Sequence, residues 1–153
     1  MKVIKTQQDI FTLPKVTEAV CVTTNGIVKK NGCAVMGKGI AKQADELYNV
    51  SKILGMRLEK YGNRAFVLGK IYHKNGGYHY LISFPTKHDW RDDSDIELIM
   101  KSCREITDIC NKFNITKCYL PPVGCGCDNL LWDDVCNFIS PLLDNRFIAV
   151  LRK

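Results

Sequence analysis

The sequence lacks any apolar run that approaches the roughly 20 residues needed for a membrane-spanning helix. Its first nine residues are too polar for a secretory signal peptide. Both features disfavour a membrane or secreted protein, so we expect a cytoplasmic location and no membrane partner. Repeats, low-complexity stretches and linkers are also missing, and the 153 residues predict a single domain, 1–153, with one sizeable core.

The pattern of a metal site is missing as well. No Cys-x-x-Cys pair is present, and the three histidines are not at ligand spacing from the close pair Cys125 and Cys127. We therefore expect a metal-independent protein without a cofactor. Eight cysteines without a secretion signal indicate reduced thiols rather than disulfides. Six of them are interpreted as small core residues: Cys21, Cys33, Cys103, Cys110, Cys118 and Cys136.

The formal net charge is +6, and the lysines are scattered rather than run together. A positive charge of this size suits an anionic ligand or a nucleic-acid partner, and it equally suits simple solubility. The charge alone leaves these two interpretations open.

Apolar runs alternate with helical patterns along the chain. Several of the runs are continuously apolar, as expected for strands that are buried on both faces. The expected strands are Lys2–Lys5, Ala19–Thr24, Ala65–Ile71, Tyr78–Phe84, Lys117–Leu120 and Arg146–Leu151. The expected helices are Gly39–Tyr48, Val50–Lys60, Ser94–Phe113 and Leu131–Leu142. This order predicts an α/β fold with a mixed sheet covered by helices on both faces.

Two of the expected helices have more specific signals. In Ser94–Phe113, apolar residues recur at three-and-four spacing, and Ser94 with Glu97 forms a capping-box pattern at the start. The stripe consists of Ile96, Ile99, Cys103, Ile106, Cys110 and Phe113. In the last helix we expect Trp132, Val135, Cys136 and Ile139 to face the core.

Two glycine-rich loops each follow an expected strand and precede an expected helix. The first is Asn31–Gln43 and the second is Leu120–Trp132. Glycine allows main-chain N–H groups to approach an anion, and a helix N-terminus adds a favourable dipole. Neither loop is a Walker A loop or a complete dinucleotide fingerprint, and each alone would be an ordinary tight turn. Together they predict a site that holds a diphosphate from two sides, at the carboxyl ends of the strands.

With these two loops, the chain resembles a macrodomain, which is an ADP-ribose-binding module. The resemblance extends over nearly the whole chain. Val35–Ala41, Phe84–Lys87 and Trp90-Arg91 resemble segments of the lysine-dependent DarG antitoxins, which remove ADP-ribose from DNA. Gly124–Asp128 resembles the terminal ADP-ribose protein glycohydrolases, although Trp132 lies one position further on. The resemblance implies a three-layer α/β/α macrodomain with a mixed central sheet. Because both branches are represented, the substrate is either modified protein or modified DNA.

The resemblance also implies a set of ligand-binding residues. Asp9-Ile10 resembles the element that holds the adenine, without its usual glycine, and the alternative for Asp9 is a helix cap or turn. Asn25 would lie near the distal ribose, and its alternative is an Asn-Gly turn with Gly26. The two loops would contact the phosphates through main-chain N–H groups. Their residues are Met36, Gly37, Lys38, Gly39 and Ile40 in the first, and Val123, Gly124, Cys125, Gly126 and Cys127 in the second. The insertion Ile27–Gly32 is expected to add a lip over the distal ribose.

The catalytic residues implied by the resemblance are Lys87 and Asp128. The lysine of the related enzymes attacks the anomeric carbon of the distal ribose, and partial burial or a nearby cation, such as Arg91 or His88, favours the reactive neutral amine. The alternative is a surface lysine after a turn. Asp128 would act as acid or base, and its alternative is a helix N-cap.

Three further residues are possible substrate contacts: His88, Trp90 and Arg91. An aromatic ring beside a guanidinium can stack on a base and bind a phosphate. The alternative is a buried Trp90 with Arg91 paired to Asp92 or Asp93.

We therefore expect a monomeric ADP-ribosyl hydrolase whose partner is ADP-ribose or an ADP-ribosylated macromolecule, with DNA among the candidates. Two alternatives remain open. A phosphatase acting on ADP-ribose 1″-phosphate would use an activated water in place of Lys87. A non-enzymatic ADP-ribose reader would need both loops and neither catalytic side chain.

Overall fold

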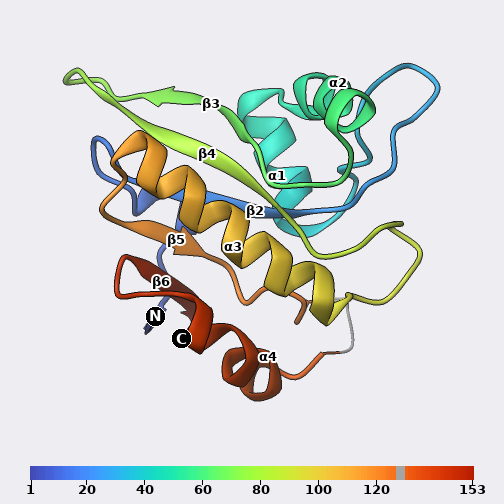
Figure 1. Cartoon of the computed structure of the whole chain (residues 1–153). Coiled ribbons are helices and arrows are strands. Elements are labelled where there is room, and N and C mark those ends of the chain that lie inside the picture. Colours follow the sequence, from blue (N-terminus) through green and yellow to red (C-terminus); the bar gives the residue numbers. More distant parts are fainter. Residues whose placement is uncertain (127–129) are drawn as a thin grey trace.

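The computed structural model describes residues 1–126 and 130–153, and its strands alternate with helices along the chain (Figure 1). The strands match the expected ones within two residues at each end. They are β1 (Lys2–Thr6), β2 (Ala19–Thr24), β3 (Val67–Tyr72), β4 (Tyr78–Pro85), β5 (Cys118–Leu120) and β6 (Phe147–Arg152). The helices are α1 (Gly39–Tyr48), α2 (Ser51–Tyr61), α3 (Ile96–Phe113) and α4 (Trp132–Ile139), with 3-10 turns η1 (Ile10–Thr12) and η2 (Ser140–Leu142).

The strands form one mixed sheet in the order β1-β6-β5-β2-β4-β3. Each neighbouring pair is parallel except β3 and β4, which form an antiparallel hairpin. The central strand β2 pairs with β4 on one side and β5 on the other. Because these three strands are parallel, their carboxyl ends meet at one edge of the sheet, where such folds bind ligands.

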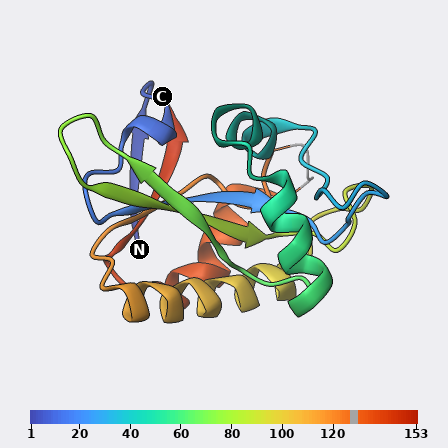
Figure 2. The same ribbon diagram turned by 90° about the horizontal axis from the view of Figure 1, so that it is seen from above.

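The two faces of the sheet carry separate apolar clusters. Side chains alternate along β2, so Ala19 and Cys21 pack toward α3 and α4, whereas Val20 and Val22 pack toward α1 and α2. Figure 2 shows α1 and α3 on opposite sides of the sheet. This arrangement confirms the expected three-layer α/β/α architecture with a mixed central sheet.

The helices differ from the expectation mainly in α3 and α4. Asp95, rather than Ser94, caps α3, because its carboxylate accepts hydrogen bonds from the main-chain N–H groups of Glu97 and Leu98. The last helix is shorter than expected, and its final turn is the 3-10 turn η2. At the end of the α3 stripe, Phe113 is partly exposed and packs against the ring of Tyr80.

The cysteines and the side chains of α4 follow the expectation only in part. Cys21, Cys103, Cys110 and Cys118 are buried, whereas Cys33 and Cys136 are half-buried because they lie on a loop and at the edge of a helix face. Val135 and Ile139 are buried as expected, and Trp132 packs at the margin of the same cluster.

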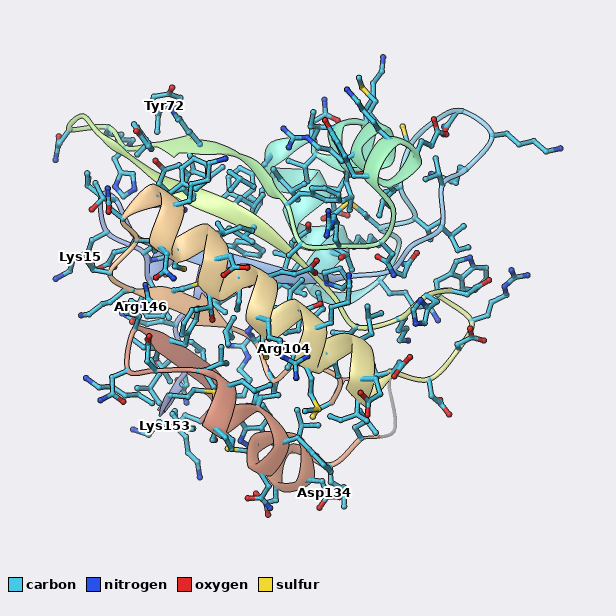
Figure 3. The ribbon with its side chains drawn as sticks, viewed as in Figure 1. Lys15, Tyr72, Arg104, Asp134, Arg146 and Lys153 are labelled. Atoms are coloured by element: carbon cyan, nitrogen blue, oxygen red, sulfur yellow. The ribbon has the colours of Figure 1, made fainter. Side chains whose placement is uncertain are left out.

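Basic side chains come from several separate segments of the chain. Lys15, Arg104, Arg146 and Lys153 lie on separate parts of the chain in Figure 3, in agreement with the scattered lysines of the sequence. None of the helices in the described ranges is both long and apolar enough to cross a membrane.

Candidate functional site

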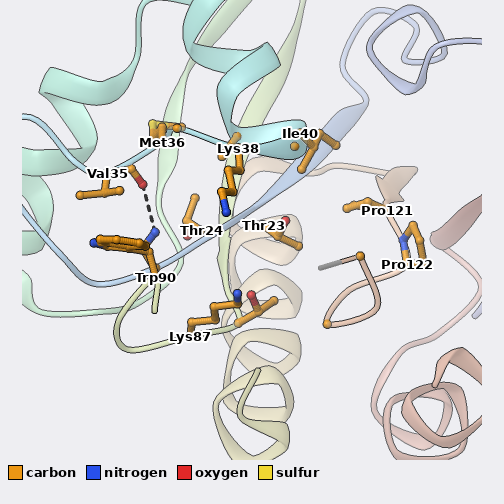
Figure 4. A pocket seen from close by; sticks show the side chains of 17 residues that line it. Thr23, Thr24, Val35, Met36, Lys38, Ile40, Lys87, Trp90, Pro121 and Pro122 are labelled. Carbon is orange, nitrogen blue, oxygen red and sulfur yellow. Dashed lines mark hydrogen bonds between the residues drawn. The ribbon is translucent and has the colours of Figure 1, made fainter. Parts of the chain in front are cut away.

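A pocket of about 460 Å³ lies at the edge of the sheet where β2, β4 and β5 end (Figure 4). This volume is within the range of small-molecule sites. The lining residues come from the ends of these strands and from both glycine-rich loops. They are Thr23, Thr24, Asn25, Val35, Met36, Gly37, Lys38, Gly39, Ile40, Ala41, Thr86, Lys87, Trp90, Pro121, Pro122, Gly124 and Gly126.

The first glycine-rich loop and the start of α1 form one wall of the pocket. Gly39 has φ +58°, a conformation that a side chain makes costly, so glycine is needed where the loop turns into the helix. Lys38 precedes the helix in an extended conformation, and its side chain makes no capping hydrogen bond. The N–H groups in the first turn of a helix have no intrahelical acceptor. This wall therefore offers main-chain donors, a helix dipole and the Lys38 ammonium to an anion.

Asn25 connects the end of β2 to this loop. Its side-chain Nδ2 donates to the Val35 carbonyl at 3.0 Å, and its Oδ1 accepts from the Ile27 N–H at 3.0 Å. The residue therefore makes the turn considered as the alternative and also lines the pocket. Both ends of the amide shape the site.

The insertion between β2 and the first loop does not form the expected lip. None of residues 27–32 lines the pocket. The segment pairs with itself through a bridge between Val28 and Ala34, and the Ala34 N–H donates to the Ser51 carbonyl. A Cβ on Gly55 of α2 would collide with the Gly32 carbonyl oxygen. The insertion packs on the helix main chain instead, and this contact directs it away from the pocket.

Lys87 lies on the opposite wall, directly after β4. In Figure 4, Lys38 and Lys87 extend into the pocket from opposite sides. The preceding residue, Thr86, is buried and joins β2 to β4 through its N–H, which donates to the Thr24 carbonyl at 3.0 Å. The side chains of Lys38 and Lys87 thus face one hollow from two different walls.

Trp90 and Arg91 do not adopt the buried alternative. Trp90 is 47% exposed and lines the pocket, with the Arg91 guanidinium 5.4 Å from its ring centre. Arg91 pairs with Asp89, at 2.6 Å between Nη2 and Oδ2, rather than with Asp92 or Asp93. The side-chain and main-chain hydrogen bonds from Arg91 lower the pKa of Asp89 to about 2. An exposed ring at the pocket mouth is available for a flat ligand group.

His88 is directed to the start of α3 rather than into the pocket. Its Nε2 lies 3.0 Å from Oδ2 of Asp95, the cap of that helix. Burial raises the pKa of Asp95, but the hydrogen bonds from His88 and from the Leu98 and Glu97 N–H groups outweigh it and lower that pKa below its usual value. His88 therefore stabilises the loop that carries Lys87.

The second glycine-rich loop contributes Pro121, Pro122, Gly124 and Gly126 to the pocket. Val123 is fully buried in the core beneath it and does not line the pocket. The Cys125 thiol lies 3.3 Å from the Val123 carbonyl, and this residue does not line the pocket either. Cys127 and Asp128, which complete the expected loop, lie outside the described residues.

Asp9 and Ile10 do not reach the pocket wall. The Asp9 carboxylate accepts a hydrogen bond from the Phe11 N–H at 3.0 Å and caps η1, as the alternative held. Ile10 packs at the margin of the cluster under α1 and α2. Their expected contact with adenine stays a prediction.

The sequence reasoning missed several lining residues, among them Thr23, Thr24 and Thr86. Thr24 is the most informative, because its hydroxyl is buried and has no hydrogen-bond partner in the described part of the chain. Each of the three lies at the carboxyl end of a parallel strand, and this position was the available signal. Within residues 1–126 and 130–153, no group of three or more histidine, cysteine or acidic side chains is arranged to hold a metal ion.

Comparison with known proteins gives relatives of one kind. Proteins of Mycobacterium bovis and Mycobacterium tuberculosis named DNA ADP-ribosyl glycohydrolase are 32% identical over 118 residues, which is 73% of this chain and 33% of theirs. A protein of the same name from Thermus aquaticus is 26% identical over 118 residues. The chain thus spans about a third of the length of the curated relatives it matches. No family model matches the sequence.

Solved structures of DarG proteins are also similar to this chain, over nearly its whole length. The macrodomain of Mycobacterium tuberculosis DarG has a TM-score of 0.74 and 25% identity, covering 99% of this chain and 98% of that one. Thermosipho africanus DarTG, solved in complex with ADP-ribose, has a TM-score of 0.75 and 21% identity, covering 98% of this chain and 41% of that one. These matches extend from β1 to β6 and include all the strands that end at the pocket.

Proposed function

We propose that this chain, which is a macrodomain of the DarG type, binds ADP-ribose in the pocket and removes it from modified DNA. The observation that carries the proposal is the pairing of the two walls: an anion-binding helix start on one side and Lys87 on the other. The names of the curated relatives support DNA as the macromolecule.

The first wall would hold the diphosphate. The main-chain N–H groups of Gly39 and Ile40 and the Lys38 ammonium would neutralise its two charges. Gly124 and Gly126 would approach it from the second loop. Because glycine has no Cβ, both loops allow the phosphate oxygens close to the main chain.

Lys87 would carry the chemistry. Its amine would attack the anomeric carbon of the distal ribose, forming a C–N bond as the bond to the DNA base breaks. The departing base takes a proton, a transfer that the resemblance to macrodomain hydrolases implies for Asp128. Water would then cleave the lysine adduct, releasing ADP-ribose and restoring the free amine.

Trp90 would contact the DNA. It is exposed at the pocket mouth, and the Arg91 guanidinium lies against it. An aromatic face in this position can stack on the modified base or a neighbouring base.

The test is a comparison of three substrates with one preparation of the protein. They are a single-stranded oligonucleotide ADP-ribosylated on thymidine, a protein ADP-ribosylated on glutamate, and ADP-ribose 1″-phosphate. We expect the oligonucleotide to be consumed fastest, releasing ADP-ribose and unmodified DNA. Faster consumption of the protein or of the phosphate would replace this proposal with the protein hydrolase or the phosphatase. ADP-ribose binding without turnover of any substrate would indicate a non-enzymatic ADP-ribose reader instead.

A further inference from the structure

The main chain that carries Lys87 is held by hydrogen bonds from several other parts of the fold. Four consecutive carbonyls, those of residues 85–88, each accept a hydrogen bond from a different donor. The Ser102 hydroxyl donates to Pro85 at 2.7 Å, and the Asp95 N–H donates to Thr86 at 2.9 Å. The Lys87 carbonyl accepts from Nδ2 of Asn63 at 2.9 Å, and the Gly26 N–H donates to the next carbonyl at 3.0 Å.

Asn63 reaches Lys87 from the loop between α2 and β3. Gly62 ends α2 with φ +83°, a left-handed conformation that turns the chain toward α3. The loop is then fixed to α3, because Glu105 accepts a hydrogen bond from the Ala65 N–H at 3.1 Å and Lys101 lies 3.5 Å from the Asn63 carbonyl. Two helices therefore set the position of the Asn63 amide.

The Asn63 amide is enclosed closely by its neighbours. A Cβ on Gly26 would lie 2.9 Å from its Cγ and 3.0 Å from the His88 carbonyl oxygen, so no larger residue fits there without movement. The Oδ1 of Asn63 is buried and has no hydrogen-bond partner among the described residues. A buried polar atom without a partner is destabilising. Among the described residues, the hydrogen bond that the Asn63 amide does make is the one from Nδ2 to the Lys87 carbonyl.

We infer that Asn63 is a positioning residue for Lys87, a role that rests on the proposed function of Lys87 as the nucleophile. The direction in which a side chain leaves the main chain follows from the main-chain position. The main chain fixes the point from which the long lysine side chain starts, so a shift there moves the region that the amine can reach. An attacking atom must lie close to its target in the correct direction, and a misplacement of about 1 Å can cost on the order of 100-fold in rate.

The test replaces Asn63 by Ala and by Asp, neither of which can donate to the Lys87 carbonyl. We expect kcat on the ADP-ribosylated oligonucleotide to fall about 10- to 100-fold. KM and the Kd for ADP-ribose should stay within about twofold, because the phosphate-binding wall is untouched. An unchanged kcat would overturn the inference. So would a parallel loss of kcat, ADP-ribose binding and thermal stability, since it would show a structural role only.

Gly26→Ala gives an independent test from the other side of the amide. Its Cβ should displace Asn63 and His88, so it should lower kcat as Asn63→Ala does, again with binding intact. Gly69→Ala is the matched control, because a Cβ on Gly69 meets nothing within 4 Å and this residue lies on β3 away from the pocket. Loss of kcat in the control as well would count against the inference.

A different readout separates this inference from the proposed function. If the wild-type protein turns over none of the substrates, the proposed function fails. The positioning of Lys87 is then measured directly, as the rate at which its amine reacts with acetic anhydride relative to Lys38 in the same sample. A changed ratio in Asn63→Ala would support the inference, and an unchanged ratio would overturn it.

Discussion

The two walls of the pocket use the main chain in opposite ways. On the wall of Gly39 and Ile40, the start of α1 lines the pocket, and the main-chain N–H groups of this first turn have no intrahelical acceptor. On the wall of Lys87, main-chain carbonyls are directed to the scaffold, and the side chain extends into the pocket. The first wall is suited to binding an anion and the second to holding a reactive group. The comparison teaches that binding and turnover should be separable by substitution.

Lys87→Ala should give the largest effect. We expect hydrolysis of the ADP-ribosylated oligonucleotide to fall by at least 10²- to 10⁴-fold, because the attacking amine is lost. ADP-ribose should still bind, as titration calorimetry would measure, because the phosphate contacts lie on the other wall. Lys87→Arg is the control that keeps the charge without the nucleophile, and it should be equally inactive. Hydrolysis at the wild-type rate in either variant would break the comparison.

Gly39→Glu should have the converse effect. Its carboxylate would lie where we expect the diphosphate, so ADP-ribose affinity should fall by more than about 100-fold. Gly39→Gln carries the same main-chain strain at φ +58° without the charge, so it should bind more tightly than the glutamate variant. Calorimetric titration of both variants checks the prediction. If Gly39→Glu binds ADP-ribose as tightly as the wild type, the diphosphate does not bind at this wall.

His79 should control stability from a site remote from both walls. It lies at the other end of β4 from the pocket, and burial, with a smaller contribution from the charge of His73, lowers its pKa to about 4. The unfolded chain, with a histidine pKa near 6.5, takes up the proton first. Stability present above pH 6.5 should therefore fall as the pH decreases toward 4, by up to about 3 kcal/mol in the free energy of unfolding. Urea unfolding at several pH values measures this.

The control for that experiment is His79→Leu, which removes the titrating group. Its free energy of unfolding should vary less between pH 6.5 and 4 than that of the wild type. An equal pH dependence in both proteins would assign the effect to other groups. If the prediction holds, a loss of activity at acidic pH can result from unfolding. The pH dependence of activity must then be compared with that of unfolding before it is assigned to a residue of either wall.

Trp90→Ala should give the smallest effect and would sharpen the description of the Lys87 wall. We expect the KM for the ADP-ribosylated oligonucleotide to rise about tenfold, because base–aromatic stacking contributes on the order of 1–3 kcal/mol. The Kd for free ADP-ribose should change less, since that ligand carries no DNA base. Trp90→Phe should recover most of the affinity. Equal weakening for both ligands would show that Trp90 contacts ADP-ribose itself rather than DNA.

Local patterns were sufficient for the elements of this fold. β2 was expected at the residues where it lies, because its continuous apolar run suits a strand buried on both faces. The start of α3 was predicted with Ser94 as its cap, whereas the structure uses Asp95, which also pairs with His88.

The site was predictable where its residues belong to a continuous motif. Met36 to Ile40 and Lys87 were expected from such motifs, and they line the pocket together. Val123 was expected among the ligand contacts, and its side chain is buried in the core, because a motif does not reveal which of its residues faces the core. Thr24 and Asn63 were missed because each depends on neighbours that only the folded chain brings together.

The sequence by itself determined the alternation of strands and helices, the two glycine-rich loops and the presence of a lysine after β4. These follow from properties of neighbouring residues: apolar periodicity, the freedom of glycine and the turn residues around Lys87. Only the tertiary structure decided that Gly39 and Lys87 face one hollow, that Trp90 is exposed and that Asn63 holds the Lys87 carbonyl. Those relations join residues 24 or more positions apart or depend on burial, and they form when parallel strands bring their carboxyl ends to one edge of the sheet.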